Sequence, residues 1–333
     1  MNLNSEREER NKTYLILVNY RSWKDTVECL ESILKLTNQN FQVFIIDNSP
    51  DQESSNSIME WARGNYGEVN TQFPDLVFPS SSPITLRYLE EEDLKGVKDF
   101  HEKIILVKAI QNKGFAAANN IALEHLRSNQ MGNYIWLLNN DTVVAPHSLD
   151  SLIDAHNTTK ADLIGSCLYE YYERDAIQSV GGTYTPILGR IQLKKNFGDK
   201  CDYPIGASMF ITRQFLDEVG LMCEDYFLFF EEYDWVLRAK RKGLEFYNED
   251  RSKIYHKGSA AIGNASLLAD FYSIKSKILF NKRFFRRSFA VFCFIFGSMF
   301  CLNRIKRGQF SRAKLFFQLL MNPNLQFHEI KHK

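Results

Sequence analysis

Four short apolar runs in the first 140 residues most constrain the fold of this 333-residue chain. They are "TYLILVNY" (13–20), "FQVFIIDN" (41–48), "KIILVKAI" (103–110) and "YIWLLNN" (134–140). Each run is almost continuously apolar and rich in β-branched or aromatic residues, which is typical of a strand buried on both faces. Segments 23–36 and 116–128 carry apolar residues at three- and four-residue steps, which predicts helices between the strands. This alternation predicts an α/β fold with a mostly parallel, doubly wound sheet.

The remainder of the chain is less regular. Residues 51–102 are polar and contain proline and serine, so we interpret them as an insertion or variable loop with a short helix near 57–65. The second half contains a strand near 161–172, a glycine-rich turn at 180–190, a helix at 229–243 and two short strands, "LEFYNE" and "SKIYHKGSA". We divide the chain into a domain of residues 1–265 and a basic helical C-terminal region of residues 266–333.

Charge and cysteine content narrow the class of protein. A net charge of +1 argues against a protein that coats nucleic acid, because phosphate binding needs a basic excess. The six cysteines form no C-x-x-C pair, and residues 1–13 lack the apolar core of a signal peptide, which indicates a cytoplasmic protein.

One segment is a candidate for membrane contact. Residues 288–302, "SFAVFCFIFGSMFCL", are uncharged and have lysines and arginines on both sides. The segment is shorter than the roughly 20 residues of a spanning helix. It fits either an internal core helix or a helix lying in the headgroup region of an inner leaflet.

Polar side chains end each of the four apolar runs: Asn19, Asp47, Asn112 and the group Asn139 to Asp141. Parallel sheets bind ligands at the carboxyl ends of their strands, so these endings predict a site for a polar ligand. No G-x-G-x-x-G follows the first run and no P-loop motif occurs. Asp47 suits a ribose hydroxyl or a base N–H, and Asp141 is an oxygen donor of the kind that Mg²⁺ or Mn²⁺ prefers. A nucleoside diphosphate with a divalent ion fits this set.

Seven motifs occur in the order seen in family 2 glycosyltransferases of the GT-A fold. They are "LILVNYRSWKDTVECLESI", "FIIDNSPD", "QNKGFAAANNIAL", "LLNNDTVV", "GASMFITRQFLDEVG", "YFLFFEEYDWVLRAKRKG" and "IYHKGSA". The chain resembles most the bacterial rhamnosyltransferase-like branch, which builds surface polysaccharides. The resemblance covers about residues 13–262, with 50–102 left out, and as a set the motifs are specific.

The resemblance implies roles for the residues at the strand ends. The nucleotide-sugar-binding candidates are Asn19, Asp47, Asn112, Gly114, Asn119 and Asn139. Glycine at 114 would let the backbone approach the ligand closely. The "NND" stretch stands where the family has a D-x-D-like signature, with Asn139 in place of the first acid. Asp141 is therefore expected to carry the metal role, together with His256.

The "FFEEYDW" stretch resembles the family's E-D-x-D signature and implies the catalytic base. An inverting transferase needs a carboxylate that takes the proton from the acceptor hydroxyl. Glu232 stands at the base position, and Asp234 or Glu231 could replace it. The alternative is that these are acids favoured in the first turn of a helix.

The sequence suggests roles for four further residues. Lys257 could neutralise phosphate, and Arg238 has the spacing for a helical ion pair with Asp234. Trp136 fits the core, and Trp235 fits either the core or a wall of the acceptor site.

These inferences predict a metal-dependent inverting glycosyltransferase with Mg²⁺ or Mn²⁺. It would move a hexose or deoxyhexose, rhamnose among them, from a nucleotide-diphosphate sugar to a glycan or lipid-linked acceptor. We expect it in the cytoplasm, peripheral on the inner face of the cell membrane. The alternatives are a sugar nucleotidyltransferase, which normally has a glycine-rich basic loop where this chain has "NYRSWKDT", and a non-catalytic scaffold, suggested by loss of the first D-x-D acid.

Overall fold

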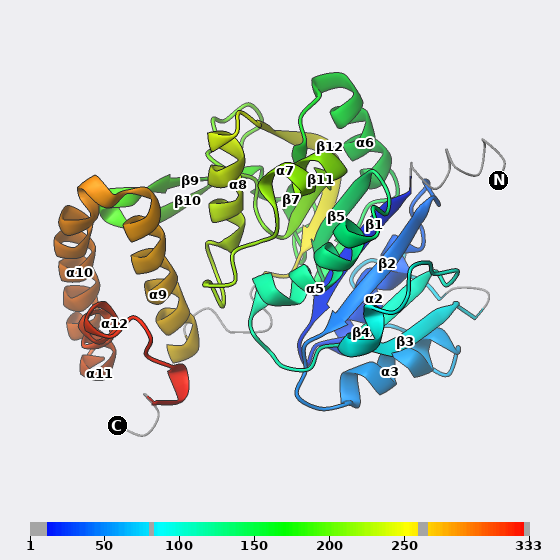
Figure 1. The fold of residues 1–333 in the computed structure, drawn as a ribbon, viewed down its shortest axis with the longest axis horizontal. Helices are drawn as coiled ribbons and strands as arrows, with labels where there is room; N and C mark the ends of the chain where they lie inside the picture. Colours follow the sequence, from blue (N-terminus) through cyan, green and yellow to red (C-terminus); the bar gives the residue numbers. More distant parts are fainter. Residues whose placement is uncertain (1–11, 80–82, 259–265, 330–333) are drawn as a thin grey trace.

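The computed structural model describes residues 12–79, 83–258 and 266–329 (Figure 1). Three of the sequence-based predictions concern residues that lie wholly or partly outside this range. They are the absence of a signal peptide, the end of the last motif and the domain boundary between residues 265 and 266.

Strands and helices alternate through the first half of the chain. They are β1 (Thr13–Asn19), α2 (Trp23–Ile33), β2 (Phe41–Asp47), α3 (Glu53–Ala62), β3 (Leu86–Glu90), α4 (Glu91–Leu94), β4 (Ile104–Lys108), α5 (Phe115–Ser128), β5 (Tyr134–Asn139), β6 (Thr142–Val144) and α6 (Ser148–Thr159). The next part contains β7 (Leu163–Glu170), β8 (Ile177–Ser179), β9 (Gly181–Thr185), η1 (Pro186–Leu188), β10 (Arg190–Lys194), β11 (Ser208–Thr212), α7 (Arg213–Val219), α8 (Glu231–Arg241) and β12 (Phe246–His256). The C-terminal helices are α9 (Leu267–Phe284), η2 (Arg286–Ser288), α10 (Phe289–Lys306), α11 (Phe310–Ala313), α12 (Leu315–Met321) and η3 (Phe327–Glu329).

The main sheet has the strand order β3-β4-β2-β1-β5-β11-β7-β12-β6, with β8 paired to β7. The strands from β3 to β5 run parallel, whereas β11 is antiparallel to both of its neighbours. The strand order reverses at β1, which has β2 on one side and β5 on the other. The predicted mostly parallel sheet is confirmed, and its switch point lies at β1.

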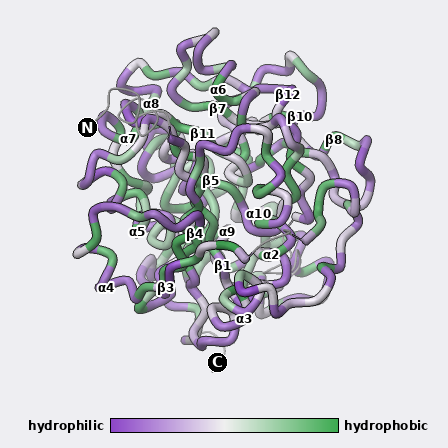
Figure 2. Tube along the Cα trace, turned by 90° about the vertical axis from the view of Figure 1, so that its right-hand side faces the viewer, coloured by the Kyte–Doolittle hydropathy of each residue, from purple (hydrophilic) through white to green (hydrophobic). Residues whose placement is uncertain are grey.

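Burial on both faces explains the continuous apolar runs. Tyr14 and Ile16 belong to the core cluster under α5, and Leu15 and Leu17 belong to the cluster under α2. All four side chains are fully buried. Figure 2 shows the hydrophobic stretches running through the central strands, inside more hydrophilic outer turns.

Strand register brings the polar strand ends to one edge of the sheet. The pairing of β1 with β2 sets Asn19 beside Asp47, and the pairing of β1 with β5 sets Val18 beside Asn139. The predicted gathering of polar residues at this edge is therefore confirmed.

Three segments differ from the sequence-based expectations. Residues 51–102 contain α3 and also β3, an edge strand that pairs in parallel with β4, so the segment is not only a loop. The stretch "LRYLE" is half-exposed and therefore lacks the continuous apolar pattern of the inner strands. The glycine-rich turn forms the two-stranded hairpin β9–β10. The two short strands expected after residue 243 are one strand, β12, with an irregularity between Glu249 and Lys253.

Helix α9 packs into the main core instead of forming a separate tail. Phe280 is fully buried, with its ring stacked on Tyr233 at 4.8 Å. Arg283 Nη1 lies 2.9 Å from the buried carboxylate of Asp234 on α8. The division at residue 265 therefore does not separate two independent cores, because the first C-terminal helix completes the core of the preceding domain.

Replacing Lys277 with methionine should stabilise the protein. This lysine lies between α9 and α10, with Nζ 5.1 Å from the centre of the Phe296 ring, and burial lowers its pKa to about 8. The unfolded value is about 10.4, so the unfolded chain binds more protons between these pH values and stability rises with pH across that window. The variant should gain about 1–3 kcal/mol at pH 7 and lose the rise between pH 8 and 10. Denaturant unfolding measures the gain in stability and its dependence on pH, with the exposed Lys282→Met as the control. An unchanged dependence of stability on pH in Lys277→Met would contradict the prediction.

Candidate functional site

A cavity of about 550 Å³ opens at the carboxyl ends of β1, β2 and β5. The loop before α8, the first turn of α8 and one side of α9 form its other walls. The lining residues are Val18, Tyr20, Ser22, Asp25, Asn48, Asn112, Gly114, Phe115, Asn139, Asn140, Asp141, Ile205, Gly206, Ala207, Phe227, Leu228, Phe229, Glu231, Glu232, His256, Leu268 and Tyr272. The cavity therefore brings together segments more than 200 residues apart.

Asp141 and His256 face each other inside this cavity. His256 Nε2 lies 3.3 Å from Asp141 Oδ1 and 3.4 Å from Asn139 Nδ2. His256 comes from the end of β12, which pairs with β6 directly after Asp141. Burial tends to raise the pKa of Asp141, but the hydrogen bond and charge of His256 oppose it, and the net pKa is lowered. Asp141 is therefore held as a carboxylate.

Gln178 on β8 orients the His256 ring. Its amide nitrogen lies 3.1 Å from the His256 carbonyl oxygen and 3.0 Å from a carboxylate oxygen of Glu170, and donates to both. Its amide oxygen therefore faces His256 Nδ1, at 2.7 Å, and accepts a hydrogen bond from it. Because the Nδ1 proton is held by Gln178, a bound ion would take the place of the Nε2 proton that is shared with Asp141. This is the arrangement that a metal-binding histidine and its supporting partner adopt.

The pair of Asp141 and His256 fits part of a divalent metal site. Two donors bound at about 2.0–2.2 Å and roughly at right angles are about 3 Å apart, which matches the observed separation. Among the described residues no group of three His, Cys, Asp or Glu side chains could hold an ion. Mg²⁺ and Mn²⁺ commonly use one or two protein donors and take the others from substrate phosphates and water. The residues present therefore fit an ion that binds together with a diphosphate.

Two adjacent glutamates at the start of α8 also line the cavity. Glu231 is buried, and one of its carboxylate oxygens lacks a hydrogen-bond partner among the described residues. Burial raises the pKa of Glu231 well above its ordinary value, and the charge of Glu232 raises it further. Burial also raises the pKa of Glu232, but backbone amides at the start of α8 oppose this effect. The pair can therefore hold one proton on Glu231 while Glu232 is the carboxylate available as a base.

Asn112 orders the loop that leads into α5. Its side-chain oxygen accepts hydrogen bonds from Asn48 Nδ2 (2.9 Å) and from the Gly114 backbone N–H (3.0 Å). Gly114 has a φ of +102°, and a Cβ at this position would lie 2.3 Å from the Phe227 carbonyl oxygen. The glycine is thus required by the approach of the 227–229 loop, and it also lines the cavity.

Replacing Gly114 with alanine should destabilise the protein by about 2–4 kcal/mol, from backbone strain and the clash with Phe227 together. The control is Gly67→Ala, because no atom lies within 4 Å of a Cβ at that position and its φ is not positive. Denaturant unfolding of both variants measures the effect. Equal stabilities of the two variants would show that the loop accommodates the extra methyl group.

Comparison with known proteins identifies the domain to which this cavity belongs. Residues 90–220 match the family described as "Glycosyl transferase family 2". Over these residues the predicted resemblance to family 2 glycosyltransferases is confirmed. The "Low-salt glycan biosynthesis hexosyltransferase Agl10" of Haloferax volcanii is 22% identical over 195 residues, which are 49% of this chain and 62% of the relative.

Two solved structures are similar in fold to this chain. "Crystal structure of GalNAc-T7 with UDP, GalNAc and Mn2+" matches with a TM-score of 0.52 and 12% identity, over 80% of this chain and 47% of the other. "Crystal structure of S. aureus TarS" matches with a TM-score of 0.48 and 12% identity, over 80% of this chain and 39% of the other, and we base no conclusion on it. The similarity to the GalNAc-T7 structure confirms the predicted GT-A fold. This chain spans less than two thirds of the length of each of these relatives.

Two of the predicted nucleotide-binding residues, Asn19 and Asp47, lie beneath the cavity. Asp47 is fully buried; its carboxylate accepts hydrogen bonds from Asn19 (2.9 Å) and Ser55 (2.5 Å) and pairs with Lys108 (3.0 Å). Asn19 is also fully buried. In this structure neither side chain reaches the cavity, because both hold the ends of β1 and β2 together. Asn48, the next residue after Asp47, lines the cavity in their place.

Asn119 and Asp234 also lie outside the cavity wall. Asn119 is buried on α5, where its amide donates to the Phe115 carbonyl (2.9 Å). Asp234 is fully buried and pairs with Arg238 (2.7 Å) and Arg283 (2.9 Å). The predicted helical pair of Asp234 and Arg238 is confirmed, and the structure places Asp234 in support of α8 and α9 instead of beside Glu232 in the cavity.

The remaining sequence candidates have structural partners. Lys257 Nζ lies 2.6 Å from Asp25 and 2.5 Å from Glu28, so its charge is already engaged by carboxylates. Trp136 and Trp235 are both fully buried. The acceptor-wall reading of Trp235 is therefore wrong, because the ring has no exposed surface.

Several residues of the site were not found by sequence reasoning. Gln178 is a single glutamine in a polar stretch and carries no signal of its own. Leu268 and Tyr272 belong to α9, and the ring of Tyr272 stacks on Phe227 at 4.3 Å. The C-terminal region thus contributes to the site, which composition alone does not indicate.

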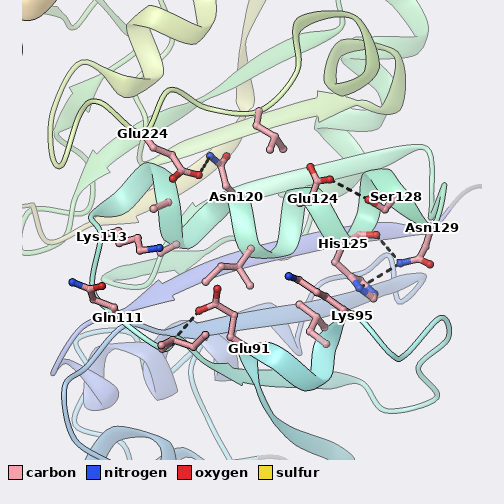
Figure 3. A pocket seen from close by; sticks show the side chains of 16 residues that line it. Glu91, Lys95, Gln111, Lys113, Asn120, Glu124, His125, Ser128, Asn129 and Glu224 are labelled. Carbon is pink, nitrogen blue, oxygen red and sulfur yellow. Dashed lines mark hydrogen bonds between the residues drawn. The ribbon is translucent and has the colours of Figure 1, made fainter.

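A second cavity, of about 580 Å³, lies on the outer side of α5 (Figure 3). Its polar side chains bond mainly to each other: Asn120 donates to Glu224 (2.8 Å), and Ser128 donates to Glu124 (3.2 Å). Its lining includes none of the strand-end residues Asn48, Asn139 or Asp141. It therefore lacks the metal donors and the acid pair of the first cavity.

Proposed function

We propose that this protein is an inverting glycosyltransferase that moves a sugar from a nucleotide-diphosphate sugar to a hydroxyl group of a glycan or lipid-linked acceptor. The observation that carries the proposal is one cavity lined by Asp141, His256 and Glu232 together. The match to family 2 and the similarity to a hexosyltransferase of glycan biosynthesis support it.

Glu232 acts as the base in this proposal. Its carboxylate takes the proton from the acceptor hydroxyl while that oxygen attacks the anomeric carbon of the donor sugar. The bond from the anomeric carbon to the diphosphate breaks on the opposite face, so the configuration inverts. The neighbouring Glu231 stays protonated and avoids a second negative charge beside the base.

A divalent ion, Mg²⁺ or Mn²⁺, would be held by Asp141 and His256 and would supply positive charge to the departing diphosphate. The need for such an ion follows from the charges of the cavity. Among its described lining residues, Asp25, Asp141 and Glu232 are carboxylates besides the protonated Glu231, and none is lysine or arginine. A diphosphate would therefore be repelled unless a cation entered with it. Asn48 and Asn112 are placed to bind the polar parts of the donor.

The donor sugar and the setting belong to the same proposal. Rhamnose, carried on dTDP, is the first donor to test, and surface polysaccharide synthesis at the inner face of the cell membrane is the proposed setting.

A donor screen tests the proposal. The purified protein is incubated with UDP- and dTDP-sugars, with and without Mn²⁺, in the presence of candidate acceptors. We expect release of the nucleoside diphosphate from one donor only when Mn²⁺ is present. Release of pyrophosphate would instead identify a nucleotidyltransferase. Nucleotide binding without turnover of any donor would favour a non-catalytic scaffold.

A further inference from the structure

Helix α10 has an apolar outer face. Val291, Phe294, Met299, Leu302 and Ile305 are all exposed on it, at spacings close to whole helical turns. A helix on the surface of a water-soluble protein normally presents polar residues on this side. Phe310 and Phe317, on the adjacent helices α11 and α12, are exposed as well. The C-terminal helices thus carry a concentration of large exposed apolar side chains.

The inner face of α10 is packed against the rest of the protein. Phe292 is fully buried and stacks on Phe296 at 5.2 Å, and Phe296 contacts Phe316 of α12 at 5.7 Å. A Cβ at Gly297 would lie 2.5 Å from the Phe316 ring, so α10 and α12 approach closely there. At the end of α10, Arg304 pairs with Asp270 of α9. One face of α10 is therefore packed against neighbouring helices, and the other face is exposed.

The charges around this apolar face have one sign. From residue 282 to residue 314 the chain contains nine lysines and arginines and no aspartate or glutamate. They stand at both ends of α10: Lys282, Arg283, Arg286 and Arg287 before it, and Arg304, Lys306, Arg307, Arg312 and Lys314 at and after its end. An apolar helical face between two basic clusters is complementary to a bilayer that carries anionic lipids.

We propose that the outer face of α10 docks on an anionic lipid surface, with the helix lying in the plane of the headgroups. Residues Arg286–Lys306 are long and apolar enough to cross a membrane by length and composition alone. Crossing would require α10 to leave α9 and α12 and would break the pair of Arg304 and Asp270. Lying in the plane keeps these contacts and places exposed basic residues such as Arg286, Arg287 and Arg307 beside lipid phosphates.

Docking through α10 would also place the candidate active site near the membrane. Helix α9 lies between α10 and the rest of the molecule (Figure 1), and its Leu268 and Tyr272 line the cavity. This consequence rests on the proposed function, since it brings the cavity within reach of a lipid-linked acceptor. The docking itself rests only on the surface of the C-terminal helices.

Vesicle sedimentation of the full chain tests the docking. The vesicles contain either phosphatidylcholine alone or phosphatidylcholine and phosphatidylglycerol in equal parts. We expect at least about 10-fold stronger binding to the anionic vesicles, weakened by added salt. The variant Phe294→Glu with Leu302→Glu should lower that binding by at least about 10-fold, because each change removes an apolar side chain from the lipid contact.

The matched control is Tyr172→Glu with Phe197→Glu. These side chains are 75% and 50% exposed, close to the 75% and 58% of Phe294 and Leu302, but they lie outside the C-terminal helices. The control should bind as the unchanged protein does. All four positions are exposed, and thermal melts check that both variants are folded. Arg286→Gln with Arg287→Gln provides a second test, in which the salt dependence of binding should weaken.

Three results would overturn the proposal. One is absence of binding to anionic vesicles by the unchanged protein, and another is equal binding by the Phe294/Leu302 variant. The third is a concentration-dependent dimer without lipid that only this variant abolishes, which would assign the face to a second copy of the chain. None of these measurements requires turnover. A negative result in the donor screen would therefore leave the docking proposal standing, and a negative result in the docking test would leave the proposed function standing.

Discussion

Replacing Glu232 with glutamine should lower kcat by about 10²–10⁴-fold, because the amide cannot take the proton of the acceptor hydroxyl. The affinity for the nucleoside diphosphate should change little, since Asp141 and His256 remain in place. The measurements are diphosphate release under saturating donor and titration of the nucleotide in the presence of Mn²⁺. Full turnover in Glu232→Gln would remove this residue from the role of base.

Glu231→Gln is the matched control for this prediction. Burial and the neighbouring charge raise the pKa of Glu231, so it is expected to be protonated already, and glutamine resembles its neutral form. We expect this variant to keep turnover within about 10-fold of the unchanged protein. A loss as large as that of Glu232→Gln would transfer the role of base to Glu231.

The pH dependence of turnover gives an independent check on Glu232. Burial raises its pKa above the ordinary glutamate value of about 4.3. A base must be deprotonated, so kcat should fall as the pH drops through this raised pKa, at a higher pH than for an exposed glutamate. In Glu231→Gln the inflection should stay at nearly the same pH, because Glu231 is expected to be neutral already where Glu232 ionises.

Replacing Asp141 with alanine should weaken Mn²⁺-dependent nucleotide binding by at least about 100-fold, since it removes the one carboxylate that faces His256. Binding without Mn²⁺ should change much less. Gln178→Ala should have a smaller effect of about 10-fold, because it removes the partner that orients His256 but leaves both donors. Calorimetric titration with and without Mn²⁺ measures these effects.

Asp75→Ala serves as the control for Asp141→Ala. Asp75 is an exposed aspartate that pairs with Arg174 away from the cavity, so its loss should leave nucleotide binding unchanged. Unchanged Mn²⁺-dependent affinity in Asp141→Ala would contradict the assigned metal role. Equal losses in Gln178→Ala and Asp141→Ala would suggest that the ring orientation, more than the carboxylate, limits binding.

The inner strands of the sheet were predictable because their burial leaves a local signal. Residues such as Leu15 and Ile16 are apolar in succession since each faces a different core cluster. The edge strand β3 was missed because one side is open, and its residues Arg87 and Glu90 interrupt the pattern. The approximate position of the site followed from the same strands, because a parallel sheet gathers their polar ends at one edge.

Individual site residues could not be predicted as reliably. Asp47 and Asp141 both follow buried strands, yet Asp47 is enclosed by Asn19, Ser55 and Lys108, whereas Asp141 faces the cavity. Asp234 and Glu232 stand two residues apart on α8, and this spacing on a helix turns them to different sides. Which acid reaches the ligand therefore depends on the surroundings of each side chain.

By itself the sequence determined the class of sheet, the edge at which polar groups gather and the presence of an acid pair at the start of a helix. These properties follow from short-range patterns, because burial and helix periodicity act over neighbouring residues. Only the tertiary structure decided that Gln178 orients His256, 78 residues away, and that α9 closes the cavity. Such contacts depend on strand register and helix packing between distant segments, which leave no periodic trace in the chain.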